Sequence, residues 1–378
     1  MKLPALLQNL PPALLMDIGT GTKDVLCFTP TDTLENNIKL VVPTPASLMA
    51  EQLETWVGDL AISGYTMGGG YLAKVLRHHR EKGHRICMES FPAFTVRNNL
   101  EEITASGIEV VERIDKPTHV FDEIELPLYF DLMTRFGFNP DQIKVIGVSV
   151  QDHGFHTHDE SSRKNRFKYF LEHLEKAAAP RSLVFTPADL PDVFQRLKSA
   201  GLCISRFRPD LKVVLIDTSF SAILGCTFDP RVAALQGPVL YINFGNGHTM
   251  ACILDSRPDE KKPSGHSNRL LSFFEHHTRI LKQKPECLKD YVRRLAEGNL
   301  PSDEVFEDDG NGCVTFEKIP FEKLAGIVVT GPQRYLMART GIGSSIEAAP
   351  GGDMMMTGPL GLLHGMALRS ADFVEVPS

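Results

Sequence analysis

Short apolar runs alternate with amphipathic stretches along most of the chain. Continuous apolar runs predict strands, whereas apolar positions that recur every three to four residues predict helices. Strands are predicted at Asp59–Tyr65, Arg85–Glu89, Ile108–Glu112, Lys144–Val150, Lys212–Asp217 and Gly326–Thr330. Helices are predicted at Tyr71–Lys82, Thr95–Ser106, Asn165–Ala177, Pro191–Ala200, Leu270–Leu281, Leu288–Leu295 and Pro359–Arg369. This alternation predicts an α/β protein whose sheets are parallel or mixed and are covered by helices.

Two places depart from this alternation, because only a short glycine-containing turn joins two apolar runs. Ala13–Asp17 and Lys23–Thr29 flank the first turn, and Val239–Asn243 and His248–Leu254 flank the second. Each pair of runs predicts a β-hairpin. Since the pattern occurs once near the start and once past the middle, it predicts two related lobes.

Composition narrows the class of protein. A chain of 378 residues with 42% hydrophobic and 23% charged residues suits two globular domains. A net charge of −7 argues against binding nucleic acid through phosphate contacts, and the basic stretch Arg77–Arg85 is interpreted as a solvated helix end. The seven cysteines include no CxxC pair, which favours a reducing compartment. The apolar N-terminal stretch is broken by Pro11 and Pro12, so the protein is expected in the cytoplasm and away from membranes.

The first turn has the residues of a phosphate-binding loop. Glycines let the backbone approach a phosphate closely, and threonine hydroxyls add donors beside the backbone N–H groups. Asp17, at the strand end, is a candidate Mg²⁺ ligand acting through water. The candidate nucleotide-binding residues of this turn are Asp17, Gly19, Thr20, Gly21, Thr22 and Lys23. A plain hairpin turn is the alternative for this loop taken alone.

The second turn repeats this arrangement, which favours a phosphate-binding loop over a plain hairpin turn. Its candidate nucleotide-binding residues are Asn243, Gly245, Asn246, Gly247, His248 and Thr249. Two such turns, one in each lobe, would clamp a triphosphate from both sides. A protonated His248 would pair with a terminal phosphate oxygen.

Taken in order, these motifs resemble those of the actin, hexokinase and heat-shock-chaperone superfamily. Asp217–Gly225 resembles its connecting helix, and Ile327–Arg334 resembles its adenosine motif, with Gly331, Pro332 and Gln333 as candidate contacts. The resemblance implies two ribonuclease-H-like lobes, residues 1–236 and 237–378, with ATP and Mg²⁺ in the cleft between them. Asn243 stands where the second loop often has an acid, and Pro332 replaces a glycine of the adenosine motif.

A narrower resemblance is to a prokaryotic family of unknown function labelled as a pyruvate formate-lyase activating enzyme. It is carried by Tyr65–Gly70, Phe244–Thr249, Phe274–Thr278 and Gly352–Gly358. A radical-generating activase needs a CxxxCxxC cluster motif, and this sequence has none. The resemblance therefore supports the fold and not the label.

Polar residues after predicted strands are candidates for catalysis. Gln151-Asp152-His153-Gly154 is similar to a strand end that approaches the sugar in carbohydrate kinases of the superfamily. Asp217 is the first candidate for the group that orients or deprotonates the acceptor, and Asp152 and His153 follow. Helix capping is the alternative role for Asp217. His156 and His158 are candidate metal or substrate ligands, with a polar loop as the alternative.

Two further segments are candidates for substrate binding. Thr66, Gly68, Gly69 and Gly70 precede a predicted helix, whose N-terminus attracts anions. Glu275, His276 and His277 fall within a predicted helix, where neighbouring side chains point in different directions, so one histidine is expected to face the cleft. Packing roles are the alternative for both segments.

The sequence therefore predicts an ATP-binding, Mg²⁺-dependent kinase that phosphorylates a small polar metabolite. The alternative is an ATP-hydrolysing switch that activates a partner enzyme, and a third reading is a binder without turnover. A small-molecule acceptor or a client enzyme is the expected partner, and the oligomeric state is left open.

Overall fold

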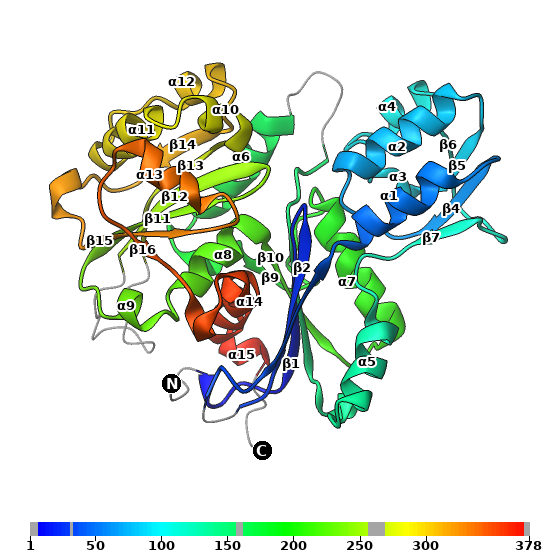
Figure 1. Cartoon of the computed structure of the whole chain (residues 1–378), viewed down its shortest axis with the longest axis horizontal. Coiled ribbons are helices and arrows are strands. Elements are labelled where there is room, and N and C mark those ends of the chain that lie inside the picture. Colours follow the sequence, from blue (N-terminus) through cyan, green and yellow to red (C-terminus); the bar gives the residue numbers. More distant parts are fainter. Residues whose placement is uncertain (1–6, 31–32, 156–161, 256–268, 374–378) are drawn as a thin grey trace.

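The computed structural model describes residues 7–30, 33–155, 162–255 and 269–373 (Figure 1). Its first sheet is built around the central strand β1, which pairs antiparallel with β2 and parallel with β8. Strand β10 continues the parallel part of the sheet. The order is β3 (Ile38–Pro43), β2 (Thr22–Phe28), β1 (Ala13–Ile18), β8 (Val145–Val150), β10 (Lys212–Asp217) and β9 (Val184–Phe185).

The second sheet repeats this plan around β11, which pairs antiparallel with β12 and parallel with β15. Its order is β14 (Gly312–Thr315), β13 (Arg269–His277), β12 (His248–Asp255), β11 (Pro238–Phe244), β15 (Gly326–Thr330) and β16 (Ile346–Glu347). In both sheets an antiparallel meander, of three strands in the first sheet and four in the second, joins two parallel strands through its first strand. This shared order confirms two ribonuclease-H-like lobes of the actin-like ATPase fold.

One predicted helix is wrong. Residues 270–277 belong to strand β13, and only the short helix α10 (Thr278–Gln283) follows. Strand β13 lies between β12 and β14, and seven of its nine residues are buried. A strand buried on both faces has a continuous apolar run without a two-residue period, which periodicity alone does not separate from a buried helix.

A third sheet lies in an insertion between β3 and β8, which we call the insertion. Its four strands are all parallel, and it has a hydrophobic core of its own. The strand order is β6 (Glu109–Val111), β5 (Ile86–Glu89), β4 (Leu60–Gly64) and β7 (His119–Phe121). Its helices are α1 (Pro45–Thr55), α2 (Gly70–Glu81), α3 (Ser90–Ala93) and α4 (Leu100–Ala105). In Figure 1 the insertion stands apart from the second sheet, on the other side of the first.

The remaining helices lie around the two larger sheets (Figure 1). Those before the second sheet are α5 (Leu126–Arg135), α6 (Ser162–Leu174), α7 (Gln195–Phe207), α8 (Thr218–Cys226) and α9 (Pro230–Ala233). Those after β13 are α10, α11 (Cys287–Glu297), α12 (Ser302–Glu307), α13 (Met337–Thr340), α14 (Thr357–Leu368) and α15 (Ser370–Phe373). Within the described residues, no helix has the length and apolar character that crossing a membrane requires.

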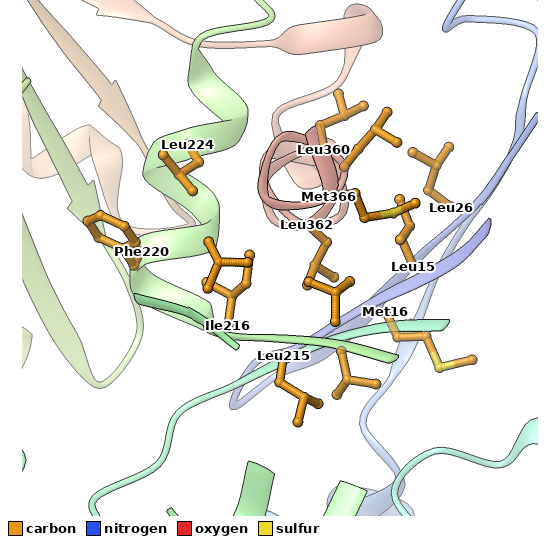
Figure 2. Packing of buried hydrophobic residues seen from close by; sticks show 14 of the residues in the cluster. Leu15, Met16, Leu26, Leu215, Ile216, Phe220, Leu224, Leu360, Leu362 and Met366 are labelled. Carbon is orange, nitrogen blue, oxygen red and sulfur yellow. The ribbon is translucent and has the colours of Figure 1, made fainter. Parts of the chain in front are cut away.

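Helices α8 and α14 cross between the two larger sheets, and their contact is the centre of the main core (Figure 2). Glycines let the backbones meet there. A Cβ atom added at Gly361 would lie 1.7 Å from the backbone oxygen of Ser221, and one at Gly225 would lie 1.8 Å from that of Thr357. Helix α14 follows the second sheet in the chain but packs on β1, β8 and β10 of the first. The division of the chain at residues 236 and 237 stays a prediction.

Candidate nucleotide and substrate site

A cavity of about 570 Å³ lies between the insertion and the two glycine turns. The first turn contributes Gly19 and Thr20, and the second contributes Gly247 and His248. The structure brings twelve of the predicted site residues to this cavity: Gly19, Thr20, Thr66, Gly68, Gly69, Gly70, Gln151, Asp152, His153, Gly247, His248 and His277. They come from segments that are far apart in the sequence, so their meeting is a consequence of the fold.

The two turns close in the same way. The backbone N–H of Gly19 donates to the oxygen of Thr22 at 2.9 Å, and that of Gly245 donates to the oxygen of His248 at 3.0 Å. The turns also approach each other, since a Cβ atom added at Gly21 would lie 3.4 Å from Nδ2 of Asn246. The glycines of both turns leave room for a ligand to approach the backbone closely.

Asp17 lies at the base of the first turn, beneath the cavity wall. Its Oδ1 accepts hydrogen bonds from the hydroxyls of Ser149 at 2.5 Å and Thr218 at 2.6 Å. Burial raises the pKa of Asp17 to about 6. A Cβ atom added at Gly358 of α14 would lie 2.0 Å from Oδ2, so only glycine fits beside this carboxylate. A carboxylate beside a phosphate cradle has the chemistry that Mg²⁺ and its bound waters require.

Asp24 pairs directly with Asp17 across the hairpin. Burial, and then the neighbouring Asp17, raises the pKa of Asp24 to about 8. Its Oδ1 is buried and has no hydrogen-bond partner. Two carboxyl groups placed side by side in a dry environment resist ionising together.

Lys23 points away from the cavity, contrary to the role expected for it. Its fully buried ammonium donates to the backbone oxygens of Glu123 at 2.9 Å and Ile124 at 2.7 Å. It also contacts the carboxylate of Glu125 at 3.2 Å. Lys23 therefore ties the hairpin to the segment before α5, and we do not retain it as a phosphate ligand. Thr22 lies outside the cavity lining.

The polar side chains of the second turn mostly serve packing. Nδ2 of Asn243 donates to the oxygen of Ser219 at 3.4 Å, and the hydroxyls of Thr249 and Thr278 lie 3.0 Å apart. Behind the turn, Gly331, Pro332 and Gln333 follow β15. The side chain of Gln333 donates to Oδ1 of Asn246 at 2.6 Å. This segment supports the second turn and does not line the cavity.

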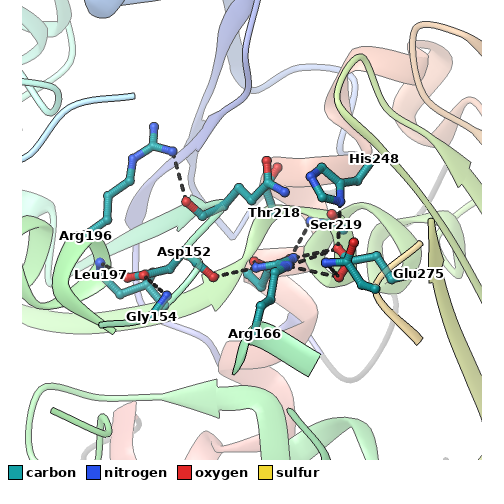
Figure 3. Close-up of polar contacts among 12 residues, drawn as sticks. Asp152, Gly154, Arg166, Arg196, Leu197, Thr218, Ser219, His248 and Glu275 are labelled. Atoms are coloured by element: carbon teal, nitrogen blue, oxygen red, sulfur yellow. Dashed lines mark hydrogen bonds and ion pairs between the residues drawn. The ribbon is translucent and has the colours of Figure 1, made fainter. Parts of the chain in front are cut away.

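Asp217, the first candidate for the catalytic acid, is held in a buried ion-pair cluster with Arg166 and Glu275, the two members that Figure 3 labels. Arg166 donates to its two oxygens at 2.7 and 3.0 Å and contacts Glu275 at 2.9 Å. Oδ1 of Asp217 also accepts the N–H of Ser219, which is the helix cap named as the alternative. Arg166 and Glu275 are fully buried and Asp217 is 3% exposed. The carboxylate of Asp217 is engaged on both oxygens and lies outside the cavity lining.

Asp152 and His153 do line the cavity. Asp152 accepts the backbone N–H groups of Gly154 and Leu197, each at 2.9 Å, and so fixes the start of α7 (Figure 3). Burial raises its pKa. Nδ1 of His153 is covered and has no hydrogen-bond partner. Burial, followed by the charge of Arg166, holds the pKa of His153 well below its ordinary value, so this imidazole is neutral.

Three histidines gather at this end of the cavity. The ring centres of His153 and His248 are 5.6 Å apart, and those of His248 and His277 are 4.4 Å apart. Burial and then the charge of Arg166 hold the pKa of His248 well below its ordinary value, and the pairing of a protonated His248 with a phosphate stays a prediction. Within the described residues, no group of His, Cys, Asp and Glu side chains is placed to hold a metal ion.

The other residues of the Glu275–His277 motif point elsewhere. They lie on strand β13 and not on a helix, and side chains along a strand alternate between its faces. Glu275 joins Arg166 at 2.9 Å, while Nε2 of His276 contacts Asp308 at 3.2 Å. Only His277 reaches the cavity, as expected for one of the two histidines. His156 and His158 lie outside the described residues.

Two arginines that the sequence pattern did not single out, Arg166 and Arg196, organise the site. Arg196, at the start of α7, donates to Gln151 O at 3.0 Å and to Oε2 of Glu123 at 2.9 Å. Oε1 of Glu123 accepts the backbone N–H of Gly68 at 2.8 Å, so this pair fixes the glycine turn before α2. One feature of the sequence could have indicated that Arg166 is buried. It lies one helical turn before Phe170, on the apolar face of α6.

A family model matches residues 67–336, well over half of the chain. The chain belongs to this family. It is described as "Putative pyruvate formate-lyase activating enzyme (DUF1786)". No curated protein sequence matches the chain.

Solved structures similar to this family member are distant in sequence. A polyphosphate/ATP-glucomannokinase from Arthrobacter sp. strain KM is 11% identical, with 95% of this chain and 99% of that chain covered and a TM-score of 0.35. The activator of 2-hydroxyisocaproyl-CoA dehydratase from Clostridium difficile, with bound ADPNP, is 12% identical, with 97% and 99% covered and a TM-score of 0.30. A Bacteroides thetaiotaomicron protein with an actin-like ATPase fold is 8% identical, with 95% and 98% covered and a TM-score of 0.34. At these scores the likenesses carry no argument about function.

The family description names an activase, and the cysteines of this member do not suit cluster chemistry. Five of the seven are buried. Burial raises the pKa of Cys27 and Cys313 to about 12, which keeps these thiols protonated, whereas a metal binds the thiolate. The chemistry of this family member is better sought at the cavity.

Proposed function

We propose that the protein binds ATP with Mg²⁺ at the two glycine turns and transfers a phosphoryl group to a small polar acceptor. The observation that carries this proposal is a single cavity bordered by both turns, by Gln151–His153 and by the Thr66–Gly70 segment. Two glycine turns beside one cavity would place a phosphoryl donor next to an acceptor. Phosphoryl transfer depends mainly on such positioning and on charge neutralisation.

The nucleotide is assigned to residues that the fold already preorganises. Backbone N–H groups of the two turns would hold the phosphates, apart from those of Gly19 and Gly245, which close the turns, and Asp17 would hold the waters of the metal. The hydroxyls of Ser149 and Thr218 fix the carboxylate of Asp17 for this role. When bound, ATP supplies the phosphoryl group and Mg²⁺ neutralises its charge.

We assign proton acceptance to His153. It lines the cavity, it is neutral, and its Nδ1 is unpartnered. As a neutral imidazole it has a nitrogen lone pair that can accept the proton, and its low pKa makes it a weak base at pH 7. Asp152 positions this segment through its bonds to the amides of Gly154 and Leu197. We do not assign Asp217 a role in proton transfer, because Arg166 occupies its carboxylate.

The test is thermal unfolding with and without Mg²⁺ and ATP, for the wild type and for Asp17→Asn. Ligand at about a hundred times its Kd adds roughly 2.7 kcal/mol of stability to the folded state. The wild type is expected to show this gain, and Asp17→Asn to lose most of it. Asp131→Asn removes an exposed carboxylate on α5 and serves as the control. An equal gain in both carboxylate variants would remove Asp17 from the site, and no gain in the wild type would overturn the proposal.

A further inference from the structure

The wall of the cavity opposite the glycine turns carries an excess of positive charge. Four cationic residues line the cavity, namely Lys74, Arg77, Arg97 and Arg196. Only Glu102 and Asp152 line it with acidic side chains. The excess stands out in a chain whose net charge is −7. Electrostatic attraction in such a recess favours an anionic ligand.

Three of these cations have no partner within the part of the chain that the structure describes. Arg196 is paired with Glu123, but Lys74, Arg77 and Arg97 make no ion pair and no side-chain hydrogen bond there. Lys74 and Arg77 are three residues apart on α2 and therefore share one face of the helix. Arg97 comes from the segment between α3 and α4. All three side chains are exposed at the cavity and have no carboxylate to neutralise them, so they are available to a ligand.

The acidic residues do not cancel this charge. Asp152 already accepts two backbone N–H groups, and burial raises its pKa. Glu102 is thus the one carboxylate in the lining without such bonds, against three unpaired cations. The basic stretch Arg77–Arg85 was interpreted as a solvated helix end. Within it, Arg77 lines the cavity and Lys82 does not.

We infer that the acceptor carries a carboxylate or phosphate group, which Lys74, Arg77 and Arg97 bind while its reactive end faces His153. This inference rests on the proposed function and names the class of its second substrate. The cations belong to the insertion, whereas the glycine turns belong to the two lobes. The anion of the acceptor and the phosphates of the nucleotide are thereby assigned to separate walls of one cavity.

The experiment compares three probes that share a carbon skeleton: glycerol 3-phosphate, glycerate and glycerol. Calorimetric titration measures the Kd of each for the wild type and for Arg77→Gln/Arg97→Gln. The control, Lys82→Gln/Lys116→Gln, removes two exposed charges of the insertion that do not line the cavity. Unfolding midpoints show whether each variant is folded, and Mg²⁺–ATP affinity is measured separately on all three proteins.

The wild type is expected to bind one or both anions and not glycerol, and the phosphate and carboxylate probes distinguish the two groups. Loss of two charge-assisted contacts should weaken anion binding about tenfold or more in Arg77→Gln/Arg97→Gln. The control should stay within about twofold, since it keeps all the lining cations. Wild-type protein that binds no anion, or a folded double variant that binds as well as the wild type, would overturn the inference. Absent Mg²⁺–ATP binding with intact anion binding would overturn the proposed function instead.

Discussion

The two glycine turns share a backbone plan but differ in charge. In the first turn Asp17 faces Asp24 across the hairpin, whereas at the matching place in the second turn Asn243 faces Met250. Asp17 accepts hydrogen bonds from two hydroxyl groups, while Asn243 donates a hydrogen bond to a backbone oxygen of α8. Two turns with the same backbone plan therefore differ in chemistry, since the first has a pair of buried carboxyl groups where the second has an amide and a methionine.

The largest expected effect concerns the contact that joins the two halves. Arg166 bridges Asp217 at the end of the first sheet and Glu275 in the second. Arg166→Met would leave two buried carboxylates without a cation, so we expect a loss of about 3–5 kcal/mol in the free energy of unfolding. Urea denaturation measures it. Arg135→Met removes an exposed partner of Asp131 and should cost less than about 1 kcal/mol. Similar losses in both variants would show that the cluster does not join the halves.

The next effect tests the acidic pair of the first turn through its pH dependence. The folded-state pKa values of Asp17 and Asp24, about 6 and about 8, lie above the ordinary value of 3.8. The folded protein therefore holds more protons than the unfolded chain, and stability falls as pH rises from about 4 to about 8. Asp24→Asn removes part of this slope and should be more stable than the wild type at pH 8 by up to a few kcal/mol. Denaturation midpoints at pH 5 and pH 8 measure the difference. If the wild type and Asp24→Asn lost stability equally between pH 5 and pH 8, the raised pKa of Asp24 would be contradicted.

The smallest effect comes from giving the second turn the charge of the first. Asn243→Asp buries a carboxylate beside the backbone oxygen of Ser219, which has no proton to donate. We expect a loss of roughly 1–3 kcal/mol at pH 8. Asn246→Asp, exposed in the same turn, keeps its bond from Gln333 and should change stability by less than about 0.5 kcal/mol. If the buried variant were as stable as the exposed one, the two turns would not differ as described.

Local chemistry made the hairpins predictable from sequence. Glycine between two apolar runs specifies a tight turn wherever it occurs, and both turns were located correctly. The twelve predicted residues that line the cavity lie at or just after strand ends or in glycine turns, which are positions where a fold exposes backbone. Strand β13 was missed because burial on both faces removes the two-residue period. The sequence did not separate the insertion from the first sheet, because the residue pattern of a strand does not show which strand it pairs with.

The direction of buried charges could not be predicted in this way. Lys23 was expected at the phosphates, but alternation along β2 turns it toward backbone oxygens 100 residues further along the chain. Asp217 was expected to act on the acceptor, but its partner Arg166 lies on α6 and meets it only in the folded chain. Long-range pairs of this kind decide which carboxylates stay available for chemistry.

The most direct test of the central claim is a crystal structure with Mg²⁺ and a non-hydrolysable ATP analogue. The proposed function predicts the β- and γ-phosphates within hydrogen-bonding distance of backbone nitrogens in both Thr20–Thr22 and Asn246–His248, with the metal near Asp17. It also predicts that the terminal phosphate faces His153 across the cavity. Phosphates bound by one turn alone, or by Lys74, Arg77 and Arg97, would contradict it.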